Sequence, residues 1–519
     1  MNYSLLKKVR VIVSLAFLLS ITILFLDITF SLPENFSDYP LYLQFIPSLL
    51  KYLSLGTLAA AGFLVVIVFT LLFGRVYCST ACPLGVLQDI ISFISKKIKK
   101  RKYVYKKPLT KTRYSILIVT ILVFLSGSVI TFNLLDPYSN FGRILSNIFQ
   151  PIVVGINNTI AFFLESFNLY WIYPVEFRGV EIFSLLFSIG IFGLVGWMSY
   201  KHGRLYCNTI CPVGTFLGFI SKFSLFKIGI TESNCISCGV CERVCKANCI
   251  DTDNSSIDFE RCVACFNCFT SCSTEAIEYQ FRYLPQKKDE PIVNISKRDF
   301  VIKSAVYFIG ANAILKAQKK IEVYKENEIP VIREFAVSPP GSVSINNFTD
   351  NCTACHLCVA ACPTHVLQPS FLEYGLLGIM QPRMDYIKGF CNYDCVVCSQ
   401  VCPSGAILPI KQEQKKLIQL GVAKFEKDNC IVYTQKTDCG ACAEHCPTKA
   451  VRMVLDPEVN KNAPKIDEEI CVGCGACEYA CPTIPYKAIY VKSNPSHLTA
   501  KLPVQEELEQ PDLEEEFPF

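Results

Sequence analysis

The chain has 519 residues with a formal net charge of +5, and 29 of its residues are cysteine. Half of the composition is apolar and the mean hydropathy is positive. This excludes a small secreted disulfide scaffold, because such proteins are short and poor in apolar residues. The length predicts several domains, and the sequence holds no motif of nucleic-acid binding.

The first 225 residues contain apolar runs that predict a helical transmembrane bundle of four spans. Each run is near the ~20 residues of a spanning helix, and several so close together favour membrane spans over buried core helices. The runs are Val11–Leu26, Leu53–Phe73, Tyr114–Phe132 and Val180–Met198. A fifth run, Pro151–Tyr173, contains Asn157, Asn158 and Glu165. We therefore expect it to lie at the outer interface or to re-enter without crossing.

Charge predicts the orientation of this bundle. Ten basic residues lie between Lys96 and Arg113, and positively charged loops stay in the cytoplasm. The N-terminus is basic as well, which agrees with an even number of spans. The basic stretch Leu87–Lys102 is amphipathic, and we expect it to rest on the cytoplasmic membrane surface.

Two copies of one motif stand at the predicted cytoplasmic ends of the span pairs. Gly74–Gly85 reads GRVYCSTACPLG, and Gly203–Gly214 reads GRLYCNTICPVG. Repeated helix pairs often form sites between them, so we expect four thiols to converge: Cys78, Cys82, Cys207 and Cys211. Three interpretations stay open, namely a further metal or cluster centre, thiols that work beside a quinone, and idle thiols at two Cys-Pro helix starts. Spacing alone does not decide whether metal binds.

Residues 226–285 predict a cytoplasmic α+β domain of the bacterial two-[4Fe–4S] ferredoxin type. The pattern C-x2-C-x2-C-x3-C occurs twice, which is typical of cubane ligation and unlike the two C-x2-C pairs of a zinc site. The fourth cysteine of each such motif binds the other cluster, so we expect Cys272 to complete the first cluster and Cys245 the second. Cys249 is interpreted as a spare buried thiol or an alternative to Cys245. The predicted ligands are Cys235, Cys238, Cys241, Cys245, Cys262, Cys265, Cys268 and Cys272.

Residues 286–325 form a linker with an export-signal pattern. Ser296–Lys303 reads SKRDFVIK, and the apolar run Ala305–Leu315 follows. This resembles a twin-arginine signal with Lys in place of the first Arg, and that route carries folded, cofactor-loaded domains. We expect the C-terminal half to be exported. The alternative is a short amphipathic linker helix, with that half left in the cytoplasm.

Residues 326–495 predict a second α+β domain, which holds four cluster motifs that each end in Cys-x3-Cys-Pro. Spacing does not tell which motif lends its fourth cysteine to which cluster. Cys352–His356 also spells the haem signature C-x-x-C-H, but the following cysteines keep the cluster register. We expect His356, His365 and His445 to be solvated. The predicted ligands are Cys352, Cys355, Cys358, Cys362, Cys391, Cys395, Cys398, Cys402, Cys430, Cys439, Cys442, Cys446, Cys471, Cys474, Cys477 and Cys481. The acidic tail at 496–519 is expected to be a disordered end or a docking arm.

With these motifs in place, residues 1–285 resemble the NapH-type membrane ferredoxins, whose C-x3-C-P membrane region is similar to that of NosR-like proteins. Residues 290–519 resemble the NapG- and MauM-type four-cluster ferredoxins. The resemblance implies a fused quinol-dehydrogenase module in the bacterial inner membrane. It also implies that the periplasmic C-terminal half passes electrons to an extracytoplasmic reductase or its cytochrome c donor.

The sequence-based hypothesis is therefore a multi-pass electron-transfer protein of anaerobic respiration, with six [4Fe–4S] clusters and quinol as substrate. The protein supplies ligands, spacing and tuning, and no bond-making active site is apparent. Two alternatives stay open. One is a conduit from reduced cytoplasmic ferredoxin into the quinone pool. The other is a redox sensor or a maturation factor for a metalloenzyme, against which the number of clusters speaks.

Overall fold

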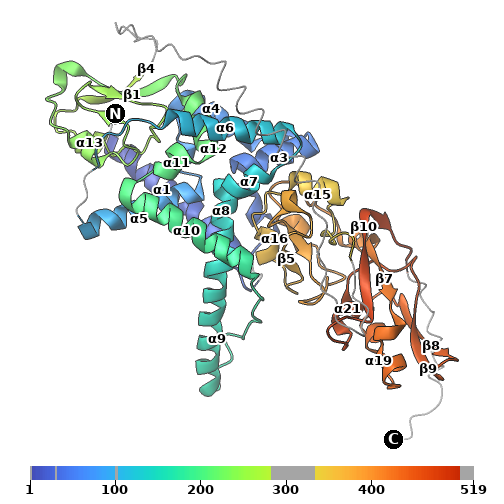
Figure 1. The fold of residues 1–519 in the computed structure, drawn as a ribbon. Helices are drawn as coiled ribbons and strands as arrows, with labels where there is room; N and C mark the ends of the chain where they lie inside the picture. The colour runs from blue at the N-terminus through green and yellow to red at the C-terminus, as the bar shows by residue number, and fades with distance from the viewer. Residues whose placement is uncertain (1–2, 30–31, 100–102, 282–332, 503–519) are drawn as a thin grey trace, which may run out of the picture.

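The computed structural model describes residues 3–29, 32–99, 103–281 and 333–502. A helical region lies in the middle, with one small α+β unit at each end (Figure 1). The first unit begins with β1 (Phe226–Ile230), and we call residues 226–281 the first ferredoxin unit. The second begins at residue 333 and is called the C-terminal ferredoxin unit. The expected export signal and the acidic part of the tail lie outside the described residues.

The helical region contains twelve α-helices among the described residues. They are α1 (Tyr3–Leu26), α2 (Asp38–Tyr42), α3 (Phe45–Leu55), α4 (Gly62–Phe73), α5 (Pro83–Lys99), α6 (Thr110–Leu125), α7 (Ile130–Leu135), α8 (Pro137–Ile144), α9 (Gln150–Ser166), α10 (Ile182–His202), α11 (Leu205–Thr209) and α12 (Pro212–Ser221). A π-helical turn at 145–149 joins α8 to α9 without a break.

Within the described ranges, three helices are long and apolar enough to cross a membrane, whereas four spans were predicted. They are Ser4–Leu26, Pro137–Ser166 and Ile182–His202. The first and third agree with predicted runs. The prediction for Leu53–Phe73 is wrong, because Gly56 ends α3 in the left-handed conformation, with φ 64°, and α4 then has only 12 residues. At 1.5 Å per residue, α4 is about 18 Å long, short of a hydrocarbon core of about 30 Å.

The third predicted run, Tyr114–Phe132, is also interrupted. The 16-residue α6 ends at Leu125, and Gly127, with φ 84°, lies in the turn before the short α7. Gly127 adopts this conformation without the steric penalty that a side chain would add. The apolar pattern of this run is therefore shared by two helices rather than one.

The fifth apolar run, which was expected not to cross, belongs to the continuous helix Pro137–Ser166. Two asparagines were the reason to expect no span. Their side chains form hydrogen bonds with the chain segment that returns alongside α9. Asn157 Nδ2 donates to Tyr173 O over 2.9 Å. Asn158 donates to Val175 O and accepts from Val175 N, each over 2.8 Å. The side-chain amides are thus satisfied without breaking the helix.

The first ferredoxin unit has α13 (Val240–Val244) and two antiparallel strand pairs. β1 (Phe226–Ile230) pairs with β4 (Ile277–Phe281) with Ile228 opposite Tyr279, and β2 (Ile250–Asp251) pairs with β3 (Ser256–Ile257). Its small core is built from cysteines and aromatic side chains, with Phe259, Phe266 and Phe269 among them. The unit contacts the start of α1, where Lys7 Nζ donates to Thr270 Oγ1 over 3.0 Å.

The C-terminal ferredoxin unit consists of short helices and three antiparallel strand pairs. The pairs are β5 (Leu367–Pro369) with β6 (Pro382–Met384), β7 (Ile418–Phe425) with β10 (Ile489–Thr499), and β8 (Val451–Asp456) with β9 (Lys461–Ile466). The helices are α15 (Ile345–Asn351), α16 (Leu357–Ala360), α17 (Val397–Gln400), α18 (Gln412–Lys415), α19 (Ile431–Thr434), α20 (Ala441–Glu444) and α21 (Ala476–Ala480).

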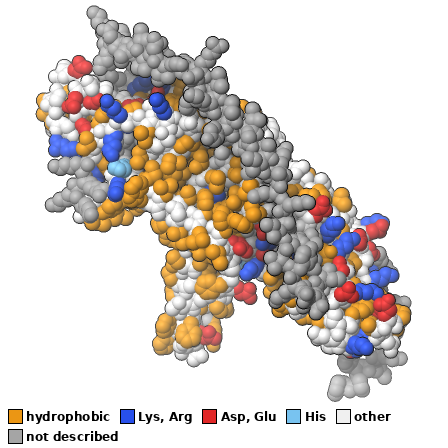
Figure 2. Space-filling view, viewed as in Figure 1, with side chains coloured by type: hydrophobic (Ala, Val, Ile, Leu, Met, Phe, Trp, Pro, Cys, Tyr) orange, Lys and Arg blue, Asp and Glu red, His pale blue; other side chains and the backbone are white. Residues whose placement is uncertain are grey.

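This unit packs on the opposite end of α1 from the first ferredoxin unit. Phe25, near the end of α1, and Cys355, before α16, belong to one buried cluster, and Gln150 Nε2 donates to Ala360 O over 3.1 Å. A helix of 24 residues is about 36 Å long, so the two units are separated by roughly the thickness of a membrane. Figure 2 shows apolar side chains mostly over the middle and along α9, and charged ones gathered toward the two ends.

Candidate iron–sulfur sites

The backbone of four cluster motifs has a shared conformation around the second cysteine. The residues just before and just after this cysteine have positive φ: Ser237 and Gly239, Ala264 and Phe266, Ala354 and His356, and Gly473 and Gly475. Most of these residues are not glycine, and a side chain held there costs energy unless its surroundings impose it. Left-handed residues of this kind turn successive N–H groups toward one point, which makes a concave anion site typical of iron–sulfur clusters.

In the first ferredoxin unit, the thiols form two groups of four. Each motif contributes its fourth cysteine to the group formed by the other motif. Cys241 lies within electrostatic reach of Cys272, Cys235 and Cys238. Cys268 lies within reach of Cys265, Cys262 and Cys245. This is the arrangement expected from the sequence, in which Cys272 and Cys245 each join the other motif. We call these groups set 1 and set 2, respectively.

The C-terminal ferredoxin unit repeats this exchange twice, which the spacing had left open. Cys402 joins Cys352, Cys355 and Cys358 in set 3, and Cys362 joins Cys391, Cys395 and Cys398 in set 4. Cys481 joins Cys430, Cys439 and Cys442 in set 5, and Cys446 joins Cys471, Cys474 and Cys477 in set 6. Successive motifs are thus paired as in a two-cluster ferredoxin.

Each set contains four thiols, which is the number of ligands that a cubane takes. Among the described residues, no three His, Cys, Asp or Glu side chains lie close enough together to hold one ion. In a cubane each thiolate binds a different iron, so its ligands lie farther apart. Burial and neighbouring thiolates raise the pKa of Cys442 to about 12, and iron would offset this by holding the thiolate form.

The four C-terminal sets lie in a row. The motifs of sets 3 and 4 exchange their fourth cysteines, and so do the motifs of sets 5 and 6. The members of each pair therefore lie next to each other. Set 4 meets set 6 where Cys391 N donates to Cys474 O over 2.9 Å and Tyr386 OH donates to Gly473 O over 2.6 Å. The order in space is therefore 3, 4, 6, 5, and set 3 is the one that contacts the helical region.

The two copies Gly74–Gly85 and Gly203–Gly214 are called the membrane repeat, after the spans predicted beside them, and their four cysteines are called the membrane thiols. These thiols converge as predicted. Cys78, Cys82, Cys207 and Cys211 are 2–3% exposed, and Cys211 lies within electrostatic reach of the other three. Pro83 and Pro212 begin α5 and α12, where a fixed φ suits the first helical turn. Cys211 caps α12 and accepts from Gly214 N over 3.3 Å. The Cys-Pro pairs therefore start helices and also bring the thiols together.

The two copies of the repeat hold each other through exchanged arginines. Arg75 Nη2 donates to Cys207 O over 3.3 Å, and Arg204 Nη1 donates to Cys78 O over 2.5 Å. Gly85 and Gly214 leave room for this, since a Cβ on either would lie 2.3 Å from the facing cysteine carbonyl. The arginine and the final glycine of each motif are thus explained by one pseudo-symmetric contact.

Asp89 is a functional neighbour of this site that the sequence analysis did not single out. It accepts from Arg204 Nε over 2.8 Å and pairs with Arg10 at 3.1 Å and Lys246 at 3.3 Å. Burial alone would raise the pKa of Asp89, but the Arg204 and Lys246 charges outweigh it and hold the pKa below its usual value. The sequence feature that could have pointed to Asp89 is that it is the last acidic residue before a long basic stretch.

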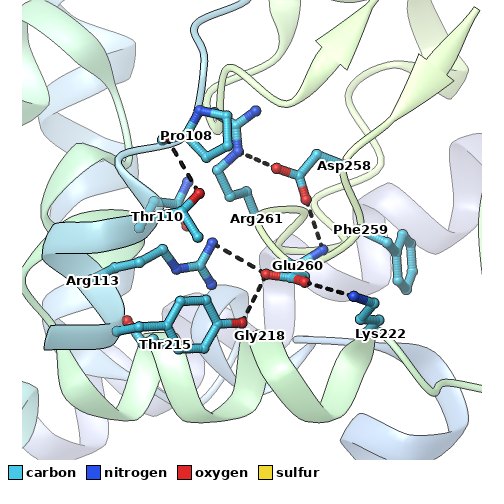
Figure 3. Close-up of polar contacts among 12 residues, drawn as sticks. Pro108, Thr110, Arg113, Thr215, Gly218, Lys222, Asp258, Phe259, Glu260 and Arg261 are labelled. Carbon is cyan, nitrogen blue, oxygen red and sulfur yellow. Dashed lines mark hydrogen bonds and ion pairs between the residues drawn. The ribbon is translucent and has the colours of Figure 1, made fainter. Parts of the chain in front are cut away.

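The first ferredoxin unit is fixed to the repeat by hydrogen bonds that its backbone carbonyls accept. Arg204 N donates to Lys246 O, next to Cys245, over 2.9 Å, and Arg75 Nη1 donates to Glu260 O over 2.9 Å. The Glu260 carboxylate lies between Arg113 at 3.7 Å and Lys222 at 3.5 Å (Figure 3). The backbone next to Cys245 of set 2 is therefore bound to the arginine that follows Gly203 in the second copy of the repeat.

On the other side, polar residues connect the membrane thiols to set 3. Tyr206, beside Cys207, accepts from Asn140 Nδ2 over 3.3 Å, and Asn140 Oδ1 accepts from Arg143 Nη2 over 2.7 Å. Tyr138, two residues before Asn140, lies within electrostatic reach of Cys355 and Cys402. All these side chains are buried, so the path between the thiol groups excludes bulk water.

The histidine predictions succeed only in part. His356 is fully buried rather than solvated, because its left-handed backbone turns the ring inward, where Nε2 lies 2.9 Å from Met380 O. His365 is partly buried, and His445 is exposed as expected. Cys249 is 1% exposed, with its Sγ 3.5 Å from that of Cys245, so the interpretation as an alternative ligand stays open.

Family models of iron–sulfur domains match three parts of the chain. A 4Fe-4S binding domain matches residues 55–101 and 183–231, and 4Fe-4S dicluster domains match 436–484 and 258–366. The first match covers both membrane repeats and ends before Cys235, so the membrane cysteines are the ones it contains. The match over 258–366 joins cysteines that the structure assigns to sets at opposite ends of α1.

Relatives of modest identity support the ferredoxin assignment. An uncharacterized protein of Methanocaldococcus jannaschii is 26% identical over 222 residues, 42% of this chain and 68% of the relative. The ferredoxin-type protein NapF of Escherichia coli K12 is 26% identical over 159 residues, 30% of this chain and 87% of NapF. The ferredoxin-type protein NapG of the same strain is 32% identical over 153 residues, 28% of this chain and 64% of NapG. No solved structure matches the chain.

The chain therefore contains several 4Fe–4S ferredoxin domains and is similar to ferredoxin-type proteins. This supports iron–sulfur electron transfer as its general function.

Proposed function

We propose that the chain is a membrane-anchored electron-transfer subunit of the quinol-dehydrogenase type, combining a NapH-like membrane half with a NapG- and MauM-like C-terminal half. It holds six [4Fe–4S] clusters in sets 1 to 6. Electrons from the quinol pool leave through the C-terminal ferredoxin unit toward an extracytoplasmic reductase or its cytochrome c donor. The observation that carries this proposal is the position of the membrane thiols between two ferredoxin units at opposite ends of α1.

A bound [4Fe–4S] cluster supplies one-electron redox chemistry, and the chain supplies its ligands and surroundings. The left-handed residues beside Cys238, Cys265, Cys355 and Cys474 would turn backbone N–H groups toward the sulfides of a bound cluster. Buried arginines hold the two repeats and the first ferredoxin unit in register, which fixes the spacing between neighbouring sets.

The membrane thiols are proposed to hold a further iron–sulfur centre. Four buried thiols face one another, and the family model that covers them describes a 4Fe-4S binding domain. Arg75 and Arg204 are buried beside them, and positive charge favours the thiolate form that a metal needs. Such a centre would connect set 2 with set 3 across the helical region.

The position of the C-terminal unit supports export. It contacts the end of α1 that lies away from the basic loop 96–113, whereas the first ferredoxin unit contacts that loop through Asn248 Nδ2, which donates to Val104 O over 2.8 Å. If the basic loop is cytoplasmic, as the positive-inside rule predicts, the C-terminal unit lies outside.

One observation favours a second direction of flow, from reduced cytoplasmic ferredoxin into the quinone pool. Cys238 of set 1 is exposed at the surface of the first ferredoxin unit, where a soluble donor could approach. In this alternative set 1 receives electrons, and the C-terminal unit is a branch rather than the exit.

The test uses purified, oxidised protein in nanodiscs with a menaquinol analogue and EPR detection of reduced clusters. We expect all six sets to become reducible by the quinol analogue in the wild type. In the double variant Cys82→Ser, Cys211→Ser, reduction should stop at the clusters of sets 1 and 2. Reduction only by ferredoxin, with no response to quinol, would support the second direction instead.

A further inference from the structure

A cavity of about 470 Å3 lies between α1, α5 and the first ferredoxin unit. On α1 it is lined by Lys7, Arg10, Val11, Ser14 and Leu15, which follow one face of a helix at spacings of three and four. A matching face of α5 forms the opposite wall, and loops around Lys246 and Asn267 close one end. The volume falls within the range of small-molecule sites, roughly 300–1,000 Å3.

The walls of the cavity are mainly apolar, and its edge faces the side of the molecule where lipid would lie. Val11 and Val86 line it from the two helices. Leu15 is 43% exposed and Phe93 is 60% exposed, and both line the cavity as well. α1 is long and apolar enough to span a membrane, so a ligand dissolved in the bilayer could enter between these two side chains.

The polar groups of the cavity carry an excess of positive charge. Asp89 is its one acidic lining residue among the described ones, and Arg10 and Lys246 already pair with it. Lys96 Nζ makes no hydrogen bond or ion pair with the described residues, and it packs over the Tyr103 ring at 4.5 Å from the centroid. The site thus offers a free cationic donor at the end of an apolar slot.

The same end of the cavity lies beside set 2. Lys96 is within electrostatic reach of Cys265 and Cys245, and the cavity is lined by Val244 and Lys246, the two neighbours of Cys245 in the sequence. A ligand bound to Lys96 would therefore lie against the thiol set that is closest to the membrane repeat.

We propose that this cavity binds the head group of a lipid-soluble quinone, with Lys96 donating to a quinone oxygen and the isoprenoid chain leaving between Leu15 and Phe93. The inference rests on the proposed function and assigns a binding site to its quinol substrate. Oxidation of one quinol here would release two protons to water at the Lys7 and Lys96 end, and two electrons that a [4Fe–4S] cluster held by set 2 would accept and pass on one at a time. An apolar ring with two carbonyls suits the walls better than a lipid phosphate, which would need several free donors.

The experiment labels the full-length, cluster-loaded protein in nanodiscs with a photoreactive azidoquinone and maps the labelled peptides. We expect label on α1 or α5, displaced by menadione. Leu15→Trp should fill the entrance and abolish this label. Ile12→Trp is the matched control, because Ile12 is 67% exposed on the same helix but does not line the cavity. Lys96→Met should weaken menadione binding about tenfold, equivalent to about 1.4 kcal/mol.

Three outcomes would overturn the site. One is label that persists in Leu15→Trp and Lys96→Met. Another is label that moves to the smaller cavity of about 160 Å3 lined by Arg178 and His365. The last is displacement by phosphatidylglycerol but not by menadione, which would make the cavity a lipid site. Label in the cavity without cluster reduction by quinol would instead contradict the proposed function and leave the binding site standing.

Discussion

The two copies of the membrane repeat have almost the same motif but different polar surroundings. In the first copy, α5 supplies Asp89, which gathers Arg10, Arg204 and Lys246. At the corresponding place in the second copy, α12 has Gly218, and a Cβ there would lie 2.5 Å from Glu260 O. The first copy therefore holds the ferredoxin unit by charge and the second by close backbone approach.

This difference shows how four thiols of nearly symmetric geometry can have different surroundings in the two copies. The exchanged arginines and the glycines keep the thiol geometry alike in both copies, whereas residues one helical turn away distinguish the two sides. The ferredoxin unit contacts both copies, through Lys246 at Asp89 on α5 and through Glu260 O at Gly218 on α12.

The largest expected effect on the stability of the docked ferredoxin unit comes from removing the Asp89 charge, which holds this unit against the first copy. Asp89→Ala leaves buried arginine and lysine side chains without their carboxylate, and breaking a buried pair in this way costs about 3–5 kcal/mol. We expect the first ferredoxin unit to detach, seen as faster proteolytic release of that unit and early loss of its visible cluster absorbance. Asp253→Ala, at an exposed carboxylate of the same unit, should leave both unchanged.

A smaller loss of stability is expected from filling the space between Gly218 of the second copy and Glu260 O. Gly218→Ala places a methyl group against Glu260 O, and overpacking of this kind costs about 1–3 kcal/mol. The midpoint temperature for loss of cluster absorbance should fall. Gly196→Ala on α10, where a Cβ meets no atom within 4 Å, should leave it unchanged or raise it slightly. Equal behaviour of the two variants would show that the close approach does not matter.

Glu260→Gln should have a still smaller effect. The Glu260 side chain is 22% exposed, and its partner Lys222 is 60% exposed, so solvent screens much of the attraction. We expect a loss of about 1 kcal/mol in the stability of the docked unit, arising mainly from buried Arg113. The wild type should become less stable at high salt while the variant changes less; an identical salt response would rule out an electrostatic role for Glu260.

The smallest effect is the response to pH between 8 and 5. The folded pKa of Asp89 lies below its unfolded value of about 3.9. Its contribution to stability is therefore fully present above pH ~4 and is lost only as pH falls through the folded pKa. The stability difference between the wild type and Asp89→Asn should stay constant from pH 8 to 5, measured by the same thermal midpoint. A difference that shrinks already at pH 6 would contradict the charge network.

The cysteine motifs predicted most of the candidate site, because ligand spacing is a local property of the chain. The exchange of Cys245 and Cys272 followed from the two-cluster pattern, and the convergence of Cys78 with Cys207 followed from the repeat. The pairing of Cys362 with Cys391 and of Cys446 with Cys471 depends on how distant loops pack, which spacing does not encode.

The helical region was predicted less well, for physical reasons that are visible at particular residues. Hydropathy does not show that Gly56 and Gly127 end helices by adopting positive φ. It also does not show that Asn157 and Asn158 are satisfied by the returning segment rather than by water. His356 seemed polar enough to be solvated, but its backbone conformation directs it into the core.

The most direct test of the central claim is an iron and sulfide determination on anaerobically purified full-length protein, combined with EPR and Mössbauer spectroscopy. Six cubanes predict about 24 iron atoms per chain in [4Fe–4S] clusters, with about four more if the membrane thiols hold another cubane. Zinc in place of iron, or an iron content far below this value after anaerobic reconstitution, would contradict the account.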